Sequence, residues 1–501
     1  MRKTFNGQMK IGAIDIASIE IDKKSRDEVP KTLLSLQYIF TNSALRSDVF
    51  RLLDQVLPTR SLKGIGRNGM SAWEILVLAS IRMSCSLDYD HLKEVSDNHA
   101  NVRLMLGLSP IVDQKITFGL QTLKDNIALL PEEVLRQINQ IVVKRGQTLM
   151  GKKANEPFLS RCDSFVVKTD VHYPTDISLL FDAIRKVIVL ISRFCDLHNI
   201  PGWRQSRFNI KAVKKRYRKA QKLKHSTSRN PEIRQKRADI IRQAYLSYLE
   251  IVRNYLEKTL DTLQLISDVA VPVAPEIPTI RYYIEHAERQ IDQTYRRVIQ
   301  NESIPHCEKV FSIFETHTEW ISKGKAGVPQ ELGKRVAIVE DEYGFIIDHQ
   351  IGDNETDDQI AVPLVMSAKK AFTDLNGCSF DKGFYTPGTR DKLKTILDQV
   401  VLPKKGKRNQ EQHQEENDIA FRKARKQHSA VESAIHSLQN HGLNKCKDKG
   451  IDGFHRYVAM GVLAFNIHKL GAVIQEQHRK NETRRRKYRE TYHENKTYQA
   501  A

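Results

Sequence analysis

Apolar residues recur at helical spacing over residues 31–150 of this 501-residue chain. Ser71 and Glu74 form the S-x-x-E arrangement of a helix start, directly ahead of the apolar run ILVLASIRM. Pro131 opens PEEVLRQINQIVVKR, where its missing N–H costs nothing. The pattern predicts several short helices, and the basic loop RSLKGIGRNG among them indicates a helical DNA-binding domain over residues 1–150. A helical dimerisation domain is the alternative.

The pattern changes near residue 158. β-Branched and aromatic residues fill FLSRCDSFVVKT, which predicts a strand. Residues 177–300 return to helical spacing, except for a proline-rich stretch at 270–278 that predicts an extended linker. Two apolar runs on either side of the turn at residues 342–344 then predict a β-hairpin.

Helical and extended stretches alternate after this hairpin. IAVPLVMSAKKAF predicts a helix, GCSFDKGF a short strand, RDKLKTILDQV a helix, VVLPKKGK a strand and ENDIAFRKARKQHSAVESAIHSL one long helix. The full order is strand, helical insert, strand, strand, helix, strand, helix, strand, helix. This order predicts an α/β fold in which helices flank a mixed sheet. The last residues, 476–501, are polar and basic, and they predict a flexible tail.

Composition narrows the class of protein. The sequence contains no run of eighteen uncharged apolar residues, which argues against a membrane span. The N-terminus has no apolar stretch typical of a signal peptide. Six scattered cysteines without a C-x-x-C pair argue against a structural zinc site or a disulfide framework and fit a reducing cytosol. The histidines lack H-E-x-x-H spacing, and no phosphate-binding G-x-x-x-x-G-K-[ST] loop is present.

The formal net charge of +20 is unevenly distributed. Residues 204–244 hold 15 Lys and Arg against Glu232 and Asp239, so this segment alone carries +13. Aromatic residues lie within or beside it, namely Trp203, Phe208 and Tyr217. Such a block attracts a polyanion by neutralising phosphates and releasing counterions. The pattern favours double-stranded DNA over an acidic membrane surface or a simple solvated helix face. The expected DNA contacts in this block are Lys214, Lys215, Arg216 and Arg218.

Three acids are candidates for metal-dependent phosphodiester chemistry. Two metal ions about 3.5–4 Å apart can clamp the attacking and leaving oxygens, and magnesium prefers oxygen ligands. Asp163 lies inside the first predicted strand, where a carboxylate among apolar neighbours is costly without a cation. Asp381 ends the strand CSFD. Glu432 lies within the last helix, with Arg425 and His428 seven and four residues before it on its face, where they suit phosphate contact.

The other acids have simpler interpretations. Asp170 follows the first strand, and we interpret it as a turn residue or a residue close to the DNA. It is also the alternative to Asp163 as the first metal ligand. We expect Asp176, or Thr175 before it, to be the N-cap of the following helix. Asp357 and Asp358 precede another helix, and we interpret them as caps as well.

The acids lie within longer stretches that resemble a known family. The stretches are DSFVVKTDVHYPTDISLLFDAIR (163–185), ETHTEWISKGK (315–325), SFDKGFYTPGTR (379–390) and HSAVESAIHSLQNHGLNKCKDKG (428–450). Together they resemble a bacterial insertion-sequence transposase of the DDE class, ISNCY-like, over about residues 155–475 and more loosely over the N-terminal third. The chain departs from the family pattern at Phe165, His428 and Gln439.

The resemblance implies an RNase H-like catalytic core over residues 155–475, with a basic helical insertion at about 177–300. Asp163, Asp381 and Glu432 would be the catalytic residues and would hold two Mg²⁺ ions, with Mn²⁺ as the alternative ion. Water would cleave one strand at the end of a mobile element, and the freed 3′-hydroxyl would attack target DNA. We expect a cytoplasmic, nucleoid-associated homodimer. A structure-specific nuclease on the same fold and a non-catalytic DNA-binding repressor are the alternatives.

Overall fold

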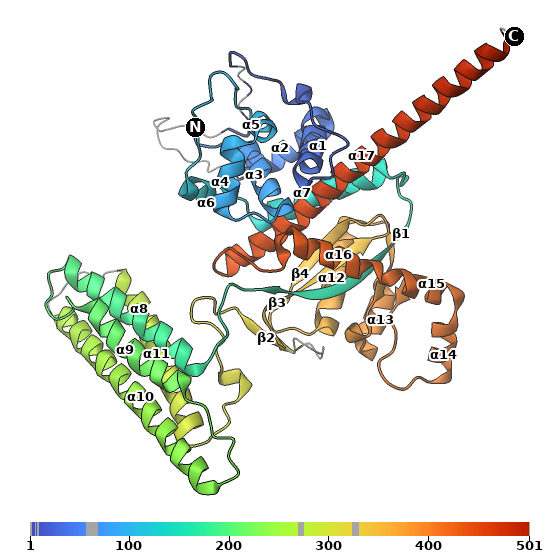
Figure 1. Cartoon of the computed structure of the whole chain (residues 1–501). Helices are drawn as coiled ribbons and strands as arrows, with labels where there is room; N and C mark the ends of the chain where they lie inside the picture. Colours follow the sequence, from blue (N-terminus) through green and yellow to red (C-terminus); the bar gives the residue numbers. More distant parts are fainter. Residues whose placement is uncertain are drawn as a thin grey trace. The chain divides into compact units, whose positions relative to one another are not determined.

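The chain divides into two compact units. Residues 1–170 and 321–501 form the first unit, and residues 171–320 form the second. The computed structural model (Figure 1) describes residues 3–56 without 6, 8 and 9, and residues 69–268, 275–322 and 330–499. The predicted basic loop at 60–69 lies outside these residues except for Gly69.

A mixed sheet is the centre of the first unit. The strands are β1 (Phe158–Lys168), β2 (Glu319–Ser322), β3 (Gln330–Asp341), β4 (Ile346–Ile351), β5 (Leu375–Phe380) and β6 (Gln399–Val401). The order is β2-β3-β1-β5-β6, and β4 also pairs with β3. β3 runs antiparallel to both β1 and β4, whereas β1, β5 and β6 are parallel. The predicted mixed sheet flanked by helices is therefore confirmed, as are the first strand and the hairpin.

Helices follow the strands in the predicted order. α12 (Asp357–Ala371) packs against β3 and β4, and α13 (Pro387–Ile396) packs against α12 and β6. The single long helix predicted after β6 is wrong, because the segment is divided into α14 (Gln410–Asn417), α15 (Ile419–His428) and α16 (Ala430–Leu438). The divisions fall at Asp418, which caps α15 with its carboxylate, and at Ser429.

The N-terminal helices share one apolar core with the sheet. They are α1 (Glu28–Thr41), α2 (Ser43–Asp54), α3 (Ala72–Ser84), α4 (Tyr89–Asn98), α5 (Ala100–Met105), α6 (Leu120–Ile127) and α7 (Glu132–Leu149). Ser71 and Glu74 form the predicted capping box of α3. Residues 1–150 are thus part of the first compact unit rather than a separate one.

The C-terminal helix α17 (Ile451–Gln499) passes between these helices and the sheet region. It packs against α1, α3 and α7, and its far end projects from them (Figure 1). Among the described residues, α17 holds the one stretch apolar and long enough to cross a membrane, but 72% of that window is buried inside the protein. This stretch therefore belongs to the core of the first unit. Residues 476–499, predicted as a flexible tail, continue this helix.

The second unit consists mainly of four long helices that lie side by side (Figure 1). They are α8 (Asp176–Leu197), α9 (Ser206–Lys222), α10 (Pro231–Asp268) and α11 (Glu276–Ile299). They enclose their own apolar cluster, separate from the core of the first unit. The proline-rich stretch predicted as a linker differs in part, because residues from Glu276 onward begin α11, while 269–274 lie outside the described residues.

Candidate active site

Strand register places two of the predicted acids next to each other. β1 and β5 are parallel neighbours, and Cys162 of β1 pairs with Phe380, the last residue of β5. The following residue of each chain segment is an acid, Asp163 on β1 and Asp381 after β5. Asp163 is half-buried, and its Oδ1 accepts a hydrogen bond from the Ser164 N–H at 2.7 Å. Asp381 is exposed.

Glu432 reaches the same place from a helix. It lies in the first turn of α16, which packs against β1, and its side chain is exposed. The partial positive charge of a helix N-terminus favours a carboxylate in this turn. Burial is the main cause that raises the pKa of Asp163 to about 6, and the negative charges of Asp381, Asp357 and Glu432 raise it further. The fold therefore brings the three predicted acids close enough for their charges to interact.

Asp357 is a fourth acid at this site, and its predicted role as a helix cap was wrong. Thr356 is the N-cap of α12 and forms a capping box with Gln359. Asp357 Oδ1 instead accepts a hydrogen bond from Ser164 Oγ at 2.6 Å and pairs with Arg335 Nη1 at 2.9 Å. Asp358, the other predicted cap, accepts a hydrogen bond from the Thr356 hydroxyl at 2.6 Å.

Gly383 shows how near two of these carboxylates are. A Cβ atom added at Gly383 would lie 3.3 Å from Asp357 Oδ2 and 3.9 Å from Asp381 Oδ2. The two oxygens thus border one small volume, which the missing side chain of Gly383 leaves open. The ligand atoms of the acids are more widely spaced than those of a tight metal site. Among the described residues, only a different trio, Glu28, His441 and His468, has three ligand atoms within 4.8 Å of one another. Mutual repulsion between carboxylates favours this wider spacing.

Of the two predicted phosphate contacts on α15, the structure brings one to the acids. His428 Nδ1 lies 3.0 Å from Ser379 Oγ, and burial lowers the pKa of His428, while the charges of Asp381 and Glu432 act in the opposite direction. Arg425 instead pairs with Glu416, its Nη1 at 3.7 Å. Glu416, which also pairs with Arg408, thus holds the Arg425 guanidinium at the end of α14.

The predicted DNA-binding cations belong to the second unit. Lys214, Lys215, Arg216 and Arg218, hereafter the α9 patch, are exposed on α9. Within the described part of residues 204–244, no Lys or Arg forms an ion pair with an acid. The positive charge of this surface is therefore not compensated by the protein itself.

The aromatic residues near this patch mostly serve the core of the second unit. Trp203 is buried, and the Tyr217 ring stacks on Phe181 with 5.0 Å between centroids and 8° between planes. Phe208 alone among the three is largely exposed, at 66%. The predicted interleaving of aromatic and basic residues therefore offers one exposed ring to a ligand.

Asp170 and Asp176 form their ion pairs with residues outside the acid cluster. Asp170 is exposed after β1 and forms an ion pair with Lys445. Of the two residues predicted as the N-cap of α8, Thr175 is the cap, in a capping box with Ser178, and Asp176 is not. Asp176 occupies the first turn and forms an ion pair with Arg297 of α11.

Comparison with known proteins gives no match: no family model, curated protein or solved structure matches this chain.

Proposed function

We propose that this chain is a DNA transposase of the DDE class, which cleaves the ends of a mobile element and joins the freed 3′-hydroxyl to target DNA. One observation carries the proposal. Asp163, Asp381 and Glu432 lie far apart in the sequence, on β1, after β5 and on α16, yet the charges of Asp381 and Glu432 both act on the carboxyl group of Asp163. A protein of net charge +20 that gathers acids at one place has a use for a cation there.

The residues of the site fit magnesium. Magnesium takes oxygen ligands and is commonly held by one or two carboxylates together with substrate phosphates and water. Asp163, Asp381 and Glu432 would hold it, and Asp357 lies close enough to bind a water or to orient a ligand. The raised pKa of Asp163 supports this assignment, because a nearby cation would favour the charged carboxylate that the cluster otherwise disfavours. When bound, the metal would activate the attacking oxygen and stabilise the leaving oxygen.

The protein's own side chains would supply the rest. Asp381 and Glu432 are exposed, so the cluster is open to a polymer substrate on their side. His428, hydrogen-bonded to Ser379 beside these acids, would contact the scissile strand. The α9 patch would bind DNA through phosphates without reading its sequence, because lysine and arginine on a helix surface exchange with condensed counterions.

The architecture supports the RNase H-like assignment. β1, the hairpin strands β3 and β4, and then β5 and β6 follow the predicted order, with β2 as an additional strand and the last predicted helix divided. β1, which carries Asp163, lies at the centre of a mixed sheet. The second unit interrupts the chain between β1 and β3, as the predicted insertion requires. A cytoplasmic location agrees with the buried position of α17, and the basic charge agrees with association with DNA, whereas the homodimer stays a prediction.

A strand-transfer assay tests the proposal. The DNA on either side of the coding gene, joined to a labelled marker, would serve as candidate ends, and supercoiled plasmid as target, in magnesium buffer. We expect cleaved ends and joined products from the wild-type chain and neither from Asp163→Asn. Asp170→Asn, with its exposed carboxylate, is the matched control and should retain joining.

The two alternatives give different results in this assay. Cleavage without joining would identify a nuclease, and DNA binding without either reaction would identify a repressor. Each of these outcomes contradicts the transposase proposal.

A further inference from the structure

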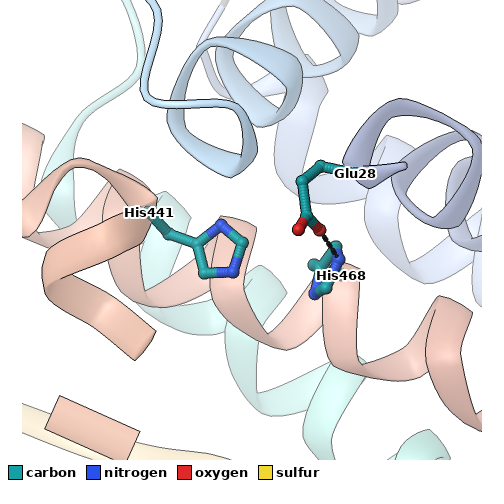
Figure 2. Close-up of side chains that lie close together, drawn as sticks. All are labelled: Glu28, His441 and His468. Atoms are coloured by element: carbon teal, nitrogen blue, oxygen red, sulfur yellow. Dashed lines mark ion pairs between the residues drawn. The ribbon is translucent and has the colours of Figure 1, made fainter. Parts of the chain in front are cut away.

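A second group of ligand-type side chains lies in the first unit, apart from the acid cluster. Glu28 begins α1, His468 lies on α17, and His441 lies on η4 (Gln439–Leu443), the short π-helical turn after α16. One ligand atom of each residue lies within 4.8 Å of those of the other two. Figure 2 shows the two imidazole rings and the carboxylate turned toward one another, with the Glu28–His468 contact dashed.

We propose that Glu28, His441 and His468 bind a zinc-class divalent ion that fastens α1 and the η4 turn to α17. Two imidazoles and one carboxylate form a ligand set that zinc accepts, with a fourth position left for water or another side chain. The inference does not depend on the proposed transposase function.

Hydrogen bonding prepares His441 for this role. Its Nδ1 lies 2.5 Å from the carbonyl oxygen of Ser84, at the end of α3, and donates its proton there. The Nε2 lone pair is then free for a metal. A metal-binding histidine commonly donates its other ring N–H to a carbonyl or carboxylate in this way, which fixes both tautomer and ring orientation.

His468 lies directly against Glu28. Its Nε2 contacts Glu28 Oε2, so two of the ligand atoms already face one another. Lys31 Nζ lies 3.4 Å from Glu28 Oε2 and competes with an ion for that carboxylate. Lys31 also donates to the Arg26 carbonyl at 2.9 Å, so its ammonium keeps a partner if the metal takes Glu28.

Cys85 is the candidate for the fourth position. It is the C-cap of α3, directly after Ser84. The carbonyl oxygen of Ser84 contacts His441 of the trio, so Cys85 is next in sequence to a residue at the site. A coordinating cation removes the proton of such a thiol.

The location gives the ion a structural role. η4 contains Gly442 with φ of 97°, a backbone conformation that L side chains rarely adopt, and the Gly442 carbonyl accepts a hydrogen bond from the Tyr457 hydroxyl at 3.0 Å. An ion on His441 would hold this turn, and with it the end of α16, against the helices of the core.

Metal binding by the full-length chain tests the inference. The protein is stripped with chelator, dialysed, and titrated with Zn²⁺, and separately with Co²⁺, whose visible absorption reports a tetrahedral site. We expect about one tightly bound ion per chain and a higher melting temperature with zinc. His468→Asn and Glu28→Gln should each weaken binding by more than the roughly 10–100-fold that loss of a group orienting a ligand costs. His478→Asn, on the same helix but outside the trio, is the matched control and should bind normally.

Two further variants separate the possible results. Asp163→Asn/Glu432→Gln should keep the ion, because the acid cluster is a different site. Cys85→Ser should weaken zinc and change the cobalt spectrum if the thiol fills the fourth position; with an unchanged spectrum, water fills it. The absence of stoichiometric zinc in wild-type protein, or unchanged affinity in both His468→Asn and Glu28→Gln, would overturn the proposal and leave an ordinary contact between α1 and α17. Glu28 is partly exposed, so its variant stays informative even if a histidine variant does not fold.

Discussion

Replacing Asp163 by asparagine should stabilise the metal-free protein while it abolishes cleavage. Asparagine keeps the side-chain oxygen that accepts the Ser164 N–H, so the change removes a charge with little loss of hydrogen bonding. The negative charge at this position is unfavourable in the folded state, because burial and the neighbouring acids raise the pKa from its ordinary value of 3.8 to about 6. Such a rise corresponds to roughly 3 kcal/mol at about 1.36 kcal/mol per pH unit. Relaxation and water reduce it, so we expect about 1–3 kcal/mol.

The stabilisation should depend on pH in a defined direction. The carboxyl titrates near 3.8 in the unfolded chain and near 6 in the folded one, so the unfolded chain loses its proton first as pH rises. The charge therefore costs folding free energy that grows between about pH 4 and pH 6 and is constant above pH 6. Wild type and Asp163→Asn should differ little below pH 4 and most above pH 6.

Urea denaturation in chelator at pH 4, 5, 6 and 7.5 measures this difference. Magnesium should then stabilise the wild type more than the variant, because only the folded wild-type site binds it well. Asp170→Asn, which breaks only the exposed pair with Lys445, should change stability by about 0–1 kcal/mol. If Asp163→Asn is less stable than wild type at pH 7.5, or if the difference does not grow with pH, the carboxylates do not interact as argued.

Three further changes test other parts of the molecule. Asp357→Asn should lower the cleavage rate by about 10–100-fold without changing DNA affinity, because it removes a charge beside the site; an unchanged rate would return Asp357 to a structural role. Neutralising the α9 patch should weaken binding to all DNA sequences and lower the slope of log affinity against log salt by about one per lost phosphate contact, measured by fluorescence anisotropy. Thr175→Ala should cost about 0.5–2 kcal/mol in urea denaturation. Asp176→Asn should cost less, about 0.2–1 kcal/mol, since it breaks only an ion pair with Arg297.

Local pattern was sufficient where an element's residues decide its structure. β1 alternates and is rich in β-branched side chains, and it forms over Phe158–Lys168. The capping box at Ser71 starts α3 as predicted. The position of Asp163 inside β1 followed from the same pattern. Its proximity to Asp381 depends on the parallel pairing of β1 with β5, which a mixed sheet allows but the alternation of strands and helices does not specify.

Local sequence patterns do not predict contacts between distant parts of the chain. The Ser35 hydroxyl donates to the carbonyl oxygen of Ile467, 432 residues away, at 2.5 Å. Contacts of this kind join α1 to α17 and make the N-terminal helices part of the sheet unit, although their own pattern suits a separate helical domain. The group of Glu28, His441 and His468 could not be predicted from the sequence for the same reason. Metal-binding motifs place their ligands close together in the sequence, whereas these three residues come from three separate helical elements.

Asp357 shows why a functional acid can be missed even when its local structure is predicted well. A carboxylate in the first turn of a helix is stabilised by the helix N-terminus, so its presence there needs no other explanation. Thr356 already supplies the cap, however, and leaves the Asp357 carboxylate free to turn toward β1. Ser164 and Arg335, on the paired strands β1 and β3, then hold it beside Asp163. The sequence indicates this role only indirectly: Asp357 follows a threonine that can cap the helix alone, so the acid is not needed as a cap. A second capping residue at a helix start that follows a sheet edge is therefore a reason to examine that acid for a role in chemistry.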